Sequence, residues 1–345
     1  MNRLYEEDLE NVANSIDINA LKNKTLFITG ANGLIGRFIV DLIMYINKAF
    51  NKNITIIANS RSLEKISEVF SNYINNKNFK YYIGDINNKI EYSDKVDYII
   101  NCASNTHPLQ YSQDPINTIL TNIKGTENVL DFASNKNARV VFLSSVEIYG
   151  ENINNIGRFK ENQMGYIDCN SLRAGYNESK RAGEALCQAY KESKNVDVVL
   201  TRLPRIFGST VKIDDSKVMS QFINKAINNE DIILKSAGTQ FFSYLYVADA
   251  ASGIFEVMLN GKNGEVYNLG NKDAEVHLRD LAKIIAESVG KEVVFDMPSE
   301  MEEKGFSKAS DARLDYSKIE KELNWKPQYS IENAIDRTIK ILKEK

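Results

Sequence analysis

Short apolar runs alternate along this chain with longer stretches in which apolar residues recur at helical spacing. The first run covers Lys24 to Thr29 and contains β-branched residues, as expected for a buried strand. The next stretch, up to Ile43, has the periodicity of an amphipathic helix. Later runs of the strand type are Ile54 to Ala58, Lys80 to Ile83, Val96 to Cys102, Arg139 to Ser144 and Val196 to Thr201. Strands and helices that alternate in this way predict an α/β fold with a doubly wound parallel sheet.

Three glycines separate the first predicted strand from the first predicted helix. They have the spacing G-x-x-G-x-x-G, one residue longer than the common dinucleotide fingerprint, and are Gly30, Gly33 and Gly36. The first permits a sharp turn, the second lets backbone approach a pyrophosphate, and the third lets the helix pack on the strand. Because N–H groups at the start of a helix favour an anion, the predicted cofactor site includes Asn32, Leu34 and Ile35. A glycine turn in an ordinary α/β protein is the alternative.

The charge balance excludes some partners. The 345 residues include 43 Lys and Arg against 46 Asp and Glu, which argues against nucleic acid and against a membrane surface. Cys102, Cys169 and Cys187 lack C-x-x-C spacing, as expected of reduced thiols in a cytoplasmic protein. With only His107 and His277 besides, no metal site is expected.

The N-terminal segment is acidic and lacks the basic start and apolar core of a secretory signal. A short amphipathic helix that caps the first strand is the better interpretation. No apolar run reaches the roughly 18 residues of a transmembrane helix, so none is expected.

The second predicted strand ends in Asn59, Ser60 and Arg61, where a dinucleotide fold meets the adenosine ribose. A carboxylate at this place favours a free 2′-hydroxyl group, whereas an arginine accommodates a 2′-phosphate. Since the carboxylate is missing and Ser60 with Arg61 can hold a phosphate, the local residues favour NADP over NAD. Arg61 as a solvated residue at a helix start is an equally good interpretation.

The ends of the next two strands also suit a cofactor. Asp85 follows the third strand, where its carboxylate can accept a hydrogen bond from the adenine amino group, and Ile86 lies beside it. Small residues at the end of the fourth strand let a cofactor approach, namely Cys102, Ala103 and Ser104. Ser104 and Asn105 are also expected to contact the substrate.

A Ser-Tyr-Lys set follows the fifth strand. That strand runs into Ser145, and further on Tyr176 and Lys180 lie at i and i+4 of a helical pattern. A phenol titrates near pH 10, about three units too high for a good base, unless a cation stabilises the phenolate. Lys180 can do this and can bond the nicotinamide ribose, while Ser145 can hold the substrate oxygen whose proton Tyr176 takes. Alone, such a Tyr and Lys are usually surface residues, but their order behind the glycine turn favours an active site.

With these motifs in order, the sequence resembles the extended short-chain dehydrogenase/reductase family, of the NAD-dependent epimerase/dehydratase type that acts on nucleotide sugars. The matching segments span nearly the whole chain: TGANGLIG at Thr29 to Gly36, Gly84 with Asp85, the Ser-Tyr-Lys set, RLPRIFG from Arg202, GTQFFSYLYVADAASGI from Gly238 and LNWKP from Leu323. The resemblance implies a Rossmann-like sheet, NAD or NADP as cofactor and a nucleotide-diphosphate sugar as substrate. It also suggests a homodimer through two helices per subunit, one of them Tyr176 to Tyr190.

Three parts are expected along the chain. Residues 1–23 form an N-terminal helical extension, and residues 24–206 form mainly the NAD(P)-binding domain. Residues 207–345 form mainly a smaller substrate-binding lobe, with some segments returning to the sheet. The active site is expected in the cleft between domain and lobe.

Departures from the family pattern bear on the reaction. The dTDP-glucose 4,6-dehydratase branch has an acid pair after the catalytic hydroxyl residue, whereas this chain has Val146 and Glu147. The UDP-glucuronate decarboxylase branch has a Glu at the Glu147 position and an Arg in its G-x-Q-x-R segment, where this chain has Phe242. Arg205, where many relatives have Asn, is expected to supply the lost positive charge. In a strand, Glu147 would share a face with Ser145 and reach the same sugar ring, and the alternative is an edge carboxylate bonded to a loop N–H.

Other residues of the lobe have two interpretations each. Val218, Phe222 and Leu234 are candidates for contacts to a nucleotide base, although their spacing also suits a hydrophobic core. Arg202 and Arg205 follow a strand end where α/β sheets bind ligands, so they are candidates for the diphosphate. For Arg202, a structural salt bridge is as good an interpretation.

The predicted activity is C4 hydride transfer on a nucleotide sugar, with epimerisation at C4 as the first hypothesis. The alternatives are an NADPH-dependent reductase of a 4-keto nucleotide sugar, and a decarboxylase or dehydratase that uses the transient ketone and Glu147. A redox-sensing binding protein without catalysis is the least favoured, because Tyr176 and Lys180 are intact.

Overall fold

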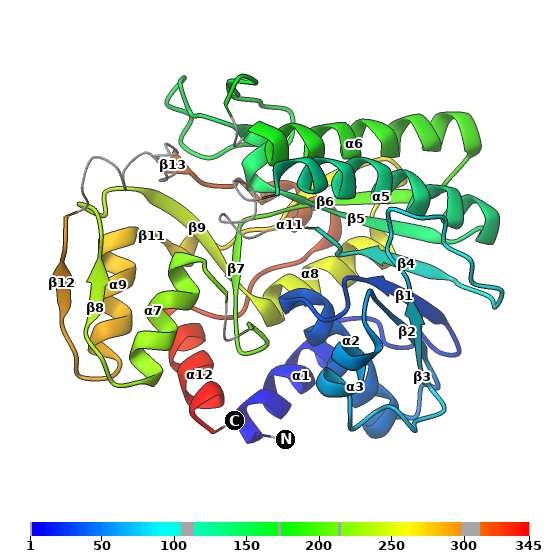
Figure 1. The fold of residues 1–345 in the computed structure, drawn as a ribbon, viewed down its shortest axis with the longest axis horizontal. Coiled ribbons are helices and arrows are strands. Elements are labelled where there is room, and N and C mark those ends of the chain that lie inside the picture. Colours follow the sequence, from blue (N-terminus) through cyan, green and yellow to red (C-terminus); the bar gives the residue numbers. More distant parts are fainter. Residues whose placement is uncertain (1, 105–113, 172–173, 213–214, 298–310, 345) are drawn as a thin grey trace.

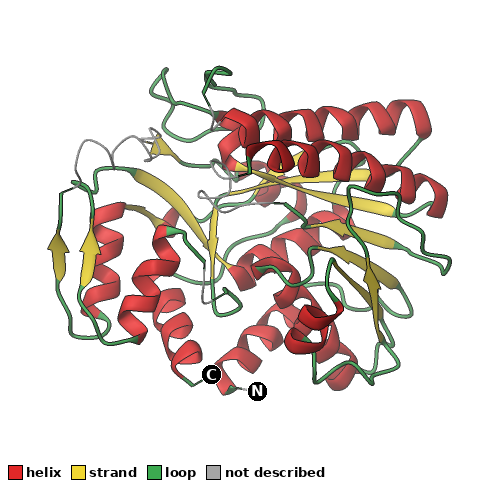
Figure 2. Cartoon of the chain, viewed as in Figure 1, coloured by secondary structure: helices red, strands yellow, loops and turns green. Residues whose placement is uncertain are grey.

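The computed structural model describes residues 2–104, 114–171, 174–212, 215–297 and 311–344. Its largest element is a seven-stranded parallel sheet with the order β10-β6-β5-β4-β1-β2-β3 (Figures 1 and 2). The strands are β1 Thr25–Thr29, β2 Thr55–Ser60, β3 Phe79–Ile83, β4 Tyr98–Asn101, β5 Arg139–Ser145, β6 Val198–Leu203 and β10 Val266–Asn268. The prediction of an α/β fold with a doubly wound parallel sheet is confirmed.

Both faces of this sheet are covered, which explains why its strands are continuous apolar runs. In β1, Leu26 and Ile28 pack into one hydrophobic cluster, and Phe27 between them packs into the other. All three side chains are fully buried. The alternation of side chains across a strand therefore divides the core into two layers.

Helices form these layers (Figure 1). On one face α5 (Pro115–Lys136) and α6 (Ala174–Lys194) pack side by side. On the other face lie α2 (Leu34–Phe50) and α8 (Val247–Asn260), with α1 (Arg3–Ser15) packed against both. The short helix α3 (Leu63–Val69) follows β2, and Ser62 caps it through a hydrogen bond from the Lys65 N–H.

Two smaller sheets and four helices make up the rest of the described chain. Strand β9 pairs with β11, β13 and β7, and β8 pairs with β12. The strands are β7 Arg205–Phe207, β8 Ile232–Leu234, β9 Phe241–Tyr246, β11 Glu275–His277, β12 Val293–Phe295 and β13 Asp311–Ala312. The helices are α7 Val218–Ile227, α9 Leu278–Glu287, α11 Ser317–Leu323 and α12 Ile331–Lys343, with 3-10 turns at Val146–Tyr149 and Lys272–Ala274.

The two ends of the described chain meet (Figure 1). Asp8 of α1 is fully buried and accepts hydrogen bonds from the Tyr246 hydroxyl group at 2.5 Å and from Arg337 Nε of α12 at 2.8 Å. Burial raises the pKa of Asp8, while these two partners lower it. The expected N-terminal helix is thus anchored by a buried polar network.

None of the helices in the described ranges is long and apolar enough to span a bilayer. The same residues contain no group of three or more His, Cys, Asp or Glu placed to hold a metal ion. All three cysteines are free.

Candidate active site

The glycine turn leaves room for backbone to meet a ligand. Gly30 has a φ of +62°, and a Cβ atom there would lie 2.9 Å from Ala103 Cα at the end of β4. A Cβ atom at Gly36 would lie 2.7 Å from the Gly30 carbonyl oxygen, so only glycine lets α2 approach β1 this closely. Gly33 is the N-cap of α2 and supplies no side-chain cap. The first N–H groups of α2, from Leu34 and Ile35 onward, therefore suit a pyrophosphate, and the predicted cofactor cradle fits.

The residues at the expected ribose position have distinct surroundings. Asn59 is buried and its Nδ2 donates to the carbonyl oxygens of Gly84 at 2.9 Å and Tyr82 at 3.2 Å, so it ties β2 to β3. Asn32 Nδ2 donates to Ser60 Oγ at 3.1 Å, and Asn32 Oδ1 is buried without a hydrogen-bond partner among the described residues. Arg61 is exposed. Ser60, Arg61 and the Asn32 oxygen are thus the groups left to meet an adenosine ribose.

The neighbouring strand ends are ordered by their own hydrogen bonds. Thr29 Oγ1 accepts from the Ala103 N–H at 3.0 Å, which holds the segment after β4 against the glycine turn, with Cys102 partly buried beside it. Asp85 Oδ1 accepts from the Asn87 N–H at 2.9 Å, and Ile86 is buried. Asn105, predicted to contact the substrate, and His107 lie outside the described residues.

Ser145, Tyr176 and Ser104 converge at the ends of β5 and β4. Tyr176 is 6% exposed. Burial raises the pKa of the Tyr176 phenol to about 12, and the negative charge of Glu147 adds to this increase. Hydrogen bonds with Ser145 and Ser104 act in the opposite direction and lower the pKa. The hydrogen bonds bring both serines next to the tyrosine, and Glu147 follows closely because its N–H donates to Ser145 Oγ.

Lys180 lies one turn along α6 from Tyr176, as the spacing predicts. Burial lowers the pKa of Lys180 to about 8. Its Nζ donates to the Leu143 carbonyl oxygen at 2.9 Å and lies over the Phe142 ring. The ammonium group is thereby directed to β5, and the effect of Lys180 on the Tyr176 pKa stays a prediction.

A chain of hydrogen bonds behind the site involves two residues that the sequence did not single out for a role. Ser104 Oγ donates to Asn122 Oδ1 at 2.8 Å, and Asn122 Nδ2 donates to Ser179 Oγ at 2.9 Å. Ser179 Oγ in turn donates to the Tyr176 carbonyl oxygen at 2.8 Å. The chain joins β4, α5 and α6, and thereby fixes the turn that carries Tyr176. A polar residue on the buried face of a helix, as Asn122 is, was the available signal.

Glu147 lies in a different backbone element from the one expected. The expectation that it shares a strand face with Ser145 is wrong, because β5 ends at Ser145 and residues 146–149 form a 3-10 turn. Ser145 Oγ caps this turn by accepting from the Glu147 N–H at 3.2 Å. The Glu147 carboxylate then pairs with Arg205 Nη2 at 3.3 Å. The partner of the Glu147 carboxylate is thus the Arg205 side chain. The alternative interpretation had this carboxylate bonded to a loop N–H instead.

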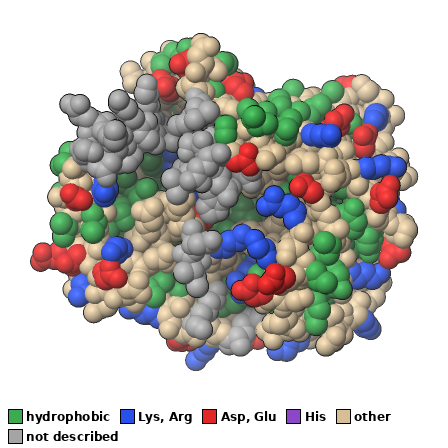
Figure 3. Space-filling view, in the orientation of Figure 1, with side chains coloured by type: hydrophobic (Ala, Val, Ile, Leu, Met, Phe, Trp, Pro, Cys, Tyr) green, Lys and Arg blue, Asp and Glu red, His purple; other side chains and the backbone are tan. Residues whose placement is uncertain are grey.

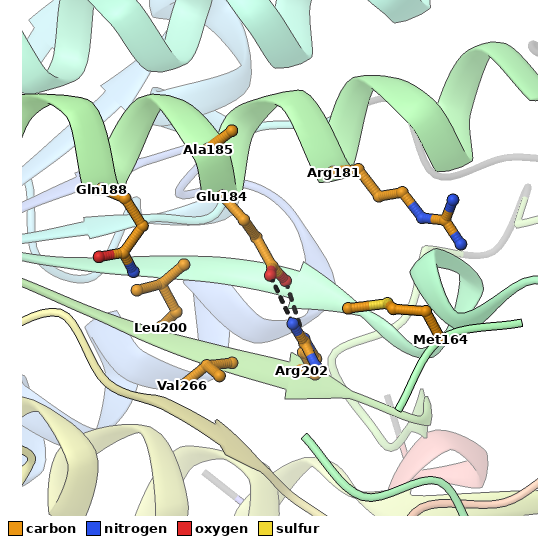
Figure 4. A pocket seen from close by; sticks show the side chains of 8 residues that line it. All are labelled: Met164, Arg181, Glu184, Ala185, Gln188, Leu200, Arg202 and Val266. Atoms are coloured by element: carbon orange, nitrogen blue, oxygen red, sulfur yellow. Dashed lines mark hydrogen bonds and ion pairs between the residues drawn. The ribbon is translucent and has the colours of Figure 1, made fainter. Parts of the chain in front are cut away.

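Arg202 has only structural partners (Figure 4). Its Nε and Nη2 donate to the two carboxylate oxygens of Glu184 at 3.0 and 2.7 Å, and its Nη1 donates to Tyr149 Oη and the Glu161 carbonyl oxygen. It lines a pocket of about 420 Å³ between α6 and the strands β6 and β10, and none of Ser145, Tyr176 and Lys180 lines this pocket. The salt-bridge interpretation of Arg202 therefore holds.

The remaining substrate candidates fall into two groups. Phe222 and Leu234 are buried in the larger hydrophobic cluster, as the core interpretation has it, whereas Val218 at the start of α7 is 44% exposed. Phe242 is 6% exposed and lies beneath the Arg205 guanidinium group. Figure 3 shows a hollow near the middle of one face, with Lys and Arg side chains beside it.

A parallel sheet with a glycine turn at β1 and a Ser-Tyr-Lys set at the end of β5 defines a dinucleotide-binding α/β enzyme. The family model described as NAD dependent epimerase/dehydratase family matches residues 26–270, well over half of the chain. The chain therefore belongs to that family, as the resemblance predicted.

Curated relatives are enzymes of the same family. The chain is 28% identical over 327 residues to UDP-glucuronic acid decarboxylase 4 of Arabidopsis thaliana, covering 94% of this chain and 70% of that protein. It is 28% identical over 316 residues to UDP-glucuronic acid decarboxylase 1 of Xenopus tropicalis, covering 92% and 71%. The chain is thus an enzyme of the NAD-dependent nucleotide-sugar epimerase, dehydratase and decarboxylase group.

Solved structures share the fold. dTDP-glucose 4,6-dehydratase from Bacillus anthracis, in complex with NAD, has a TM-score of 0.76 at 21% identity, covering 93% of this chain and 97% of that one. UDP-glucuronic acid 4-epimerase from Bacillus cereus, in complex with UDP-glucuronic acid and NAD, has a TM-score of 0.77 at 19% identity, covering 93% and 99%. At these identities the likeness establishes the fold alone.

Proposed function

We propose that this enzyme transfers a hydride between C4 of a nucleotide sugar and a nicotinamide, with C4 epimerisation as the net reaction. The observation that carries the proposal is the convergence of Ser145, Ser104 and Tyr176 at the strand ends beside the glycine turn. Bound NAD supplies the hydride acceptor for such a reaction.

Tyr176 serves as the group that takes the proton from the C4 hydroxyl group, and Ser145 holds the oxygen. With a pKa of about 12, the phenol is protonated at neutral pH, so it needs a nearby positive charge to act as a base. Lys180 is the cation within one helical turn, and when it leaves the Leu143 carbonyl oxygen it can stabilise the phenolate. The Ser104–Asn122–Ser179 hydrogen bonds hold Tyr176 in place while Lys180 moves.

For the cofactor, we propose that the pocket accepts NADP as well as NAD. Arg61 is exposed next to Ser60, and no carboxylate occupies the end of β2 to repel a 2′-phosphate. The buried oxygen of Asn32 instead suits a ribose hydroxyl donor, which either dinucleotide can provide at its 3′ position.

A second candidate is a reaction at the transient C4 ketone, decarboxylation or elimination. The specific observation in its favour is the Glu147 carboxylate within electrostatic reach of Tyr176. The named activity of the curated relatives also supports it. A net reductase of a 4-keto nucleotide sugar remains the further alternative if NADPH is the cofactor bound.

For the assembly, we propose a homodimer through α5 and α6. These helices lie side by side on one face, and the exposed Ile116 and Leu120 are one turn apart on α5. Light scattering on the purified protein tests this. Ile116→Asp combined with Leu120→Asp should give a monomer if the face is the interface.

The test of the function compares Tyr176→Phe with Tyr190→Phe, a change of the same kind further along α6. Each protein is mixed with NAD and, in turn, UDP-glucose, UDP-glucuronate and dTDP-glucose, and product, CO₂ and reduced nicotinamide are measured. Turnover should fall about a hundredfold or more in Tyr176→Phe, with cofactor binding nearly intact, and should stay normal in the control. A C4 epimer without net cofactor change identifies the epimerase, CO₂ release the decarboxylase, and stoichiometric NADPH oxidation with a 4-keto sugar the reductase. Equal turnover of the two variants would refute the role of Tyr176.

A further inference from the structure

The guanidinium group of Arg205 lies over an aromatic ring. Its Cζ lies 3.5 Å from the centroid of the Phe242 ring, and Phe242 is itself buried. Strand β7 pairs with β9 so that Arg205 lies opposite Tyr244 in register, and the Arg205 charge lowers the Tyr244 pKa against the effect of burial. Stacking of a guanidinium group on a ring fixes its plane, so the directions of its N–H groups are set in advance.

These N–H groups are mostly unused. Of the five that a guanidinium group carries, the contact with Glu147 at 3.3 Å engages only Nη2. Nη1 is buried and has no hydrogen-bond partner among the residues that the structure describes. Because buried donors nearly always find a partner, the unused nitrogen indicates an acceptor that comes with the ligand.

The position of Arg205 indicates which part of the ligand this acceptor belongs to. Glu147 pairs with Arg205 at 3.3 Å, and its N–H is hydrogen-bonded at 3.2 Å to Ser145 Oγ, the group proposed to hold the C4 oxygen. Arg205 is therefore close to the carbon at which Tyr176 acts. A diphosphate, by contrast, is separated from that carbon by the sugar ring.

We infer that Arg205 is a specificity-determining residue that binds a carboxylate on the sugar ring, so that the enzyme takes a nucleotide-linked uronic acid. The inference rests on the function proposed above, because Tyr176 marks the reacting carbon. In a uronic acid the carboxylate is attached to C5, next to C4, and its two oxygens match the fork of a guanidinium group. In this arrangement Glu147 holds the place of the substrate carboxylate and gives up Arg205 when that carboxylate arrives.

The experiment measures binding by calorimetry to the NAD-loaded enzyme. Free UDP and dTDP are compared first, and the glucose and glucuronate derivatives of the tighter-binding nucleotide are then titrated. The proteins are the wild type, Arg205→Met, Arg205→Lys, Glu147→Gln and the control Arg279→Met, which removes an exposed cation of α9 that pairs with its neighbour Asp280. Thermal unfolding and NAD affinity confirm that each variant is folded.

The wild type should bind the glucuronate derivative at least about tenfold more tightly than the glucose derivative, the size expected of a charged hydrogen-bonded pair. Arg205→Met should abolish this preference and leave the affinity for the glucose derivative within about twofold, and Arg205→Lys should retain part of it. Glu147→Gln should tighten uronate binding, because it removes the competing carboxylate. The control should behave like the wild type.

Four results would overturn the inference. Equal losses for the free nucleotide and both sugars in Arg205→Met would place the guanidinium group on the diphosphate. No loss for any of them would make Arg205 structural, and a wild type without preference between the two sugars would leave it no role in specificity. If instead both sugars show C4 hydride transfer with equal kcat/KM, the proposed function stands while this inference fails. If neither sugar binds or reacts, the proposed function itself fails.

Discussion

Two arginines three positions apart each pair with a glutamate and lie over an aromatic ring, but they differ in burial and in how many of their donors are engaged. Arg202, in β6, has an almost fully buried side chain and a donor pair to Glu184, a carboxylate that is itself largely buried. Arg205, in β7, has a side chain that is 25% exposed and, among the described residues, one hydrogen-bonded partner, Glu147, at 3.3 Å. Around Arg202 the protein engages four of the five N–H donors, whereas around Arg205 it leaves a buried nitrogen without a partner among the described residues.

This difference separates a cation that holds the fold from a cation that meets a ligand. An arginine whose donors are mostly engaged by the protein has little to offer a substrate, and its removal leaves a buried carboxylate unpaired. An unsaturated one contributes little to folding but has donors to offer. Lys180 belongs with Arg205, because one backbone carbonyl group is the only hydrogen-bond acceptor that the described residues provide for its three donors.

The largest effect on stability should come from Arg202→Met, with Arg205→Met as its comparison. Arg202→Met leaves Glu184 buried and unpaired, and should lower the free energy of unfolding by about 3–5 kcal/mol. Arg205→Met should change it by no more than about 1 kcal/mol. Urea denaturation of the two variants, with equal m-values as the check on two-state unfolding, measures both. Equal destabilisation of the two variants would mean that Arg205 supports the fold as much as Arg202 does.

Glu147→Gln tests whether the partner of Arg205 also does chemistry. If Glu147 moves a proton next to the ketone, product formation should slow by about a hundredfold and reduced nicotinamide should appear and persist in a single turnover. Stopped-flow absorbance at the reduced-nicotinamide band measures this, with the exposed Glu151→Gln as control. Absorbance and product formation like those of the wild type would leave Glu147 only its pairing role.

Lys180→Met should stabilise the protein while it removes activity. Burial lowers the pKa of Lys180 from 10.5 to about 8, so between these values the unfolded state binds a proton that the folded state does not. The charged form is therefore disfavoured in the folded protein below pH 8, and the stability lost in this way returns as the pH rises towards 10.5. At pH 7 the variant should be more stable by about 1–3 kcal/mol, and its advantage should vanish near pH 10.

Denaturation of wild type and Lys180→Met at several pH values provides the measurement. A difference that does not change with pH would mean that Lys180 is not held in a site that disfavours its charge. A destabilised variant at pH 7 would place Lys180 with Arg202 among the cations that support the fold.

The smallest effect concerns Arg61, an exposed cation at the other end of the cofactor site. Arg61→Asp should weaken NADP binding by about tenfold through repulsion of the 2′-phosphate, and should spare or improve NAD binding. Calorimetric titration with both dinucleotides tests this, and Lys65→Asp on α3 is the control for a general change in charge. A wild type that prefers NAD, with unchanged NADP affinity in the variant, would make Arg61 a surface residue.

Features that depend on neighbouring residues in the chain were predictable. The glycine turn, the parallel strands and the Tyr176–Lys180 spacing all follow from local periodicity and from what glycine permits at Gly30 and Gly36. The 3-10 turn at Glu147 was missed because a single hydrogen bond, from the Glu147 N–H to Ser145 Oγ, ends the strand pattern. The roles of Arg202 and Asn122 depend on partners in other elements, which periodicity does not reveal.

Strand β10 has a consequence for how this protein is made. It completes the edge of the seven-stranded sheet, yet it follows β7, β8 and β9, which belong to the smaller sheets. During synthesis the sheet therefore stays one strand short until residue 268 has left the ribosome, and β6 keeps an open edge until then. Open strand edges can pair with other chains, so we expect chaperones to bind the nascent polypeptide at the unpaired edge of β6 during this stage. The same chain order couples the two parts, since the large sheet cannot be completed before β7, β8 and β9 have been translated.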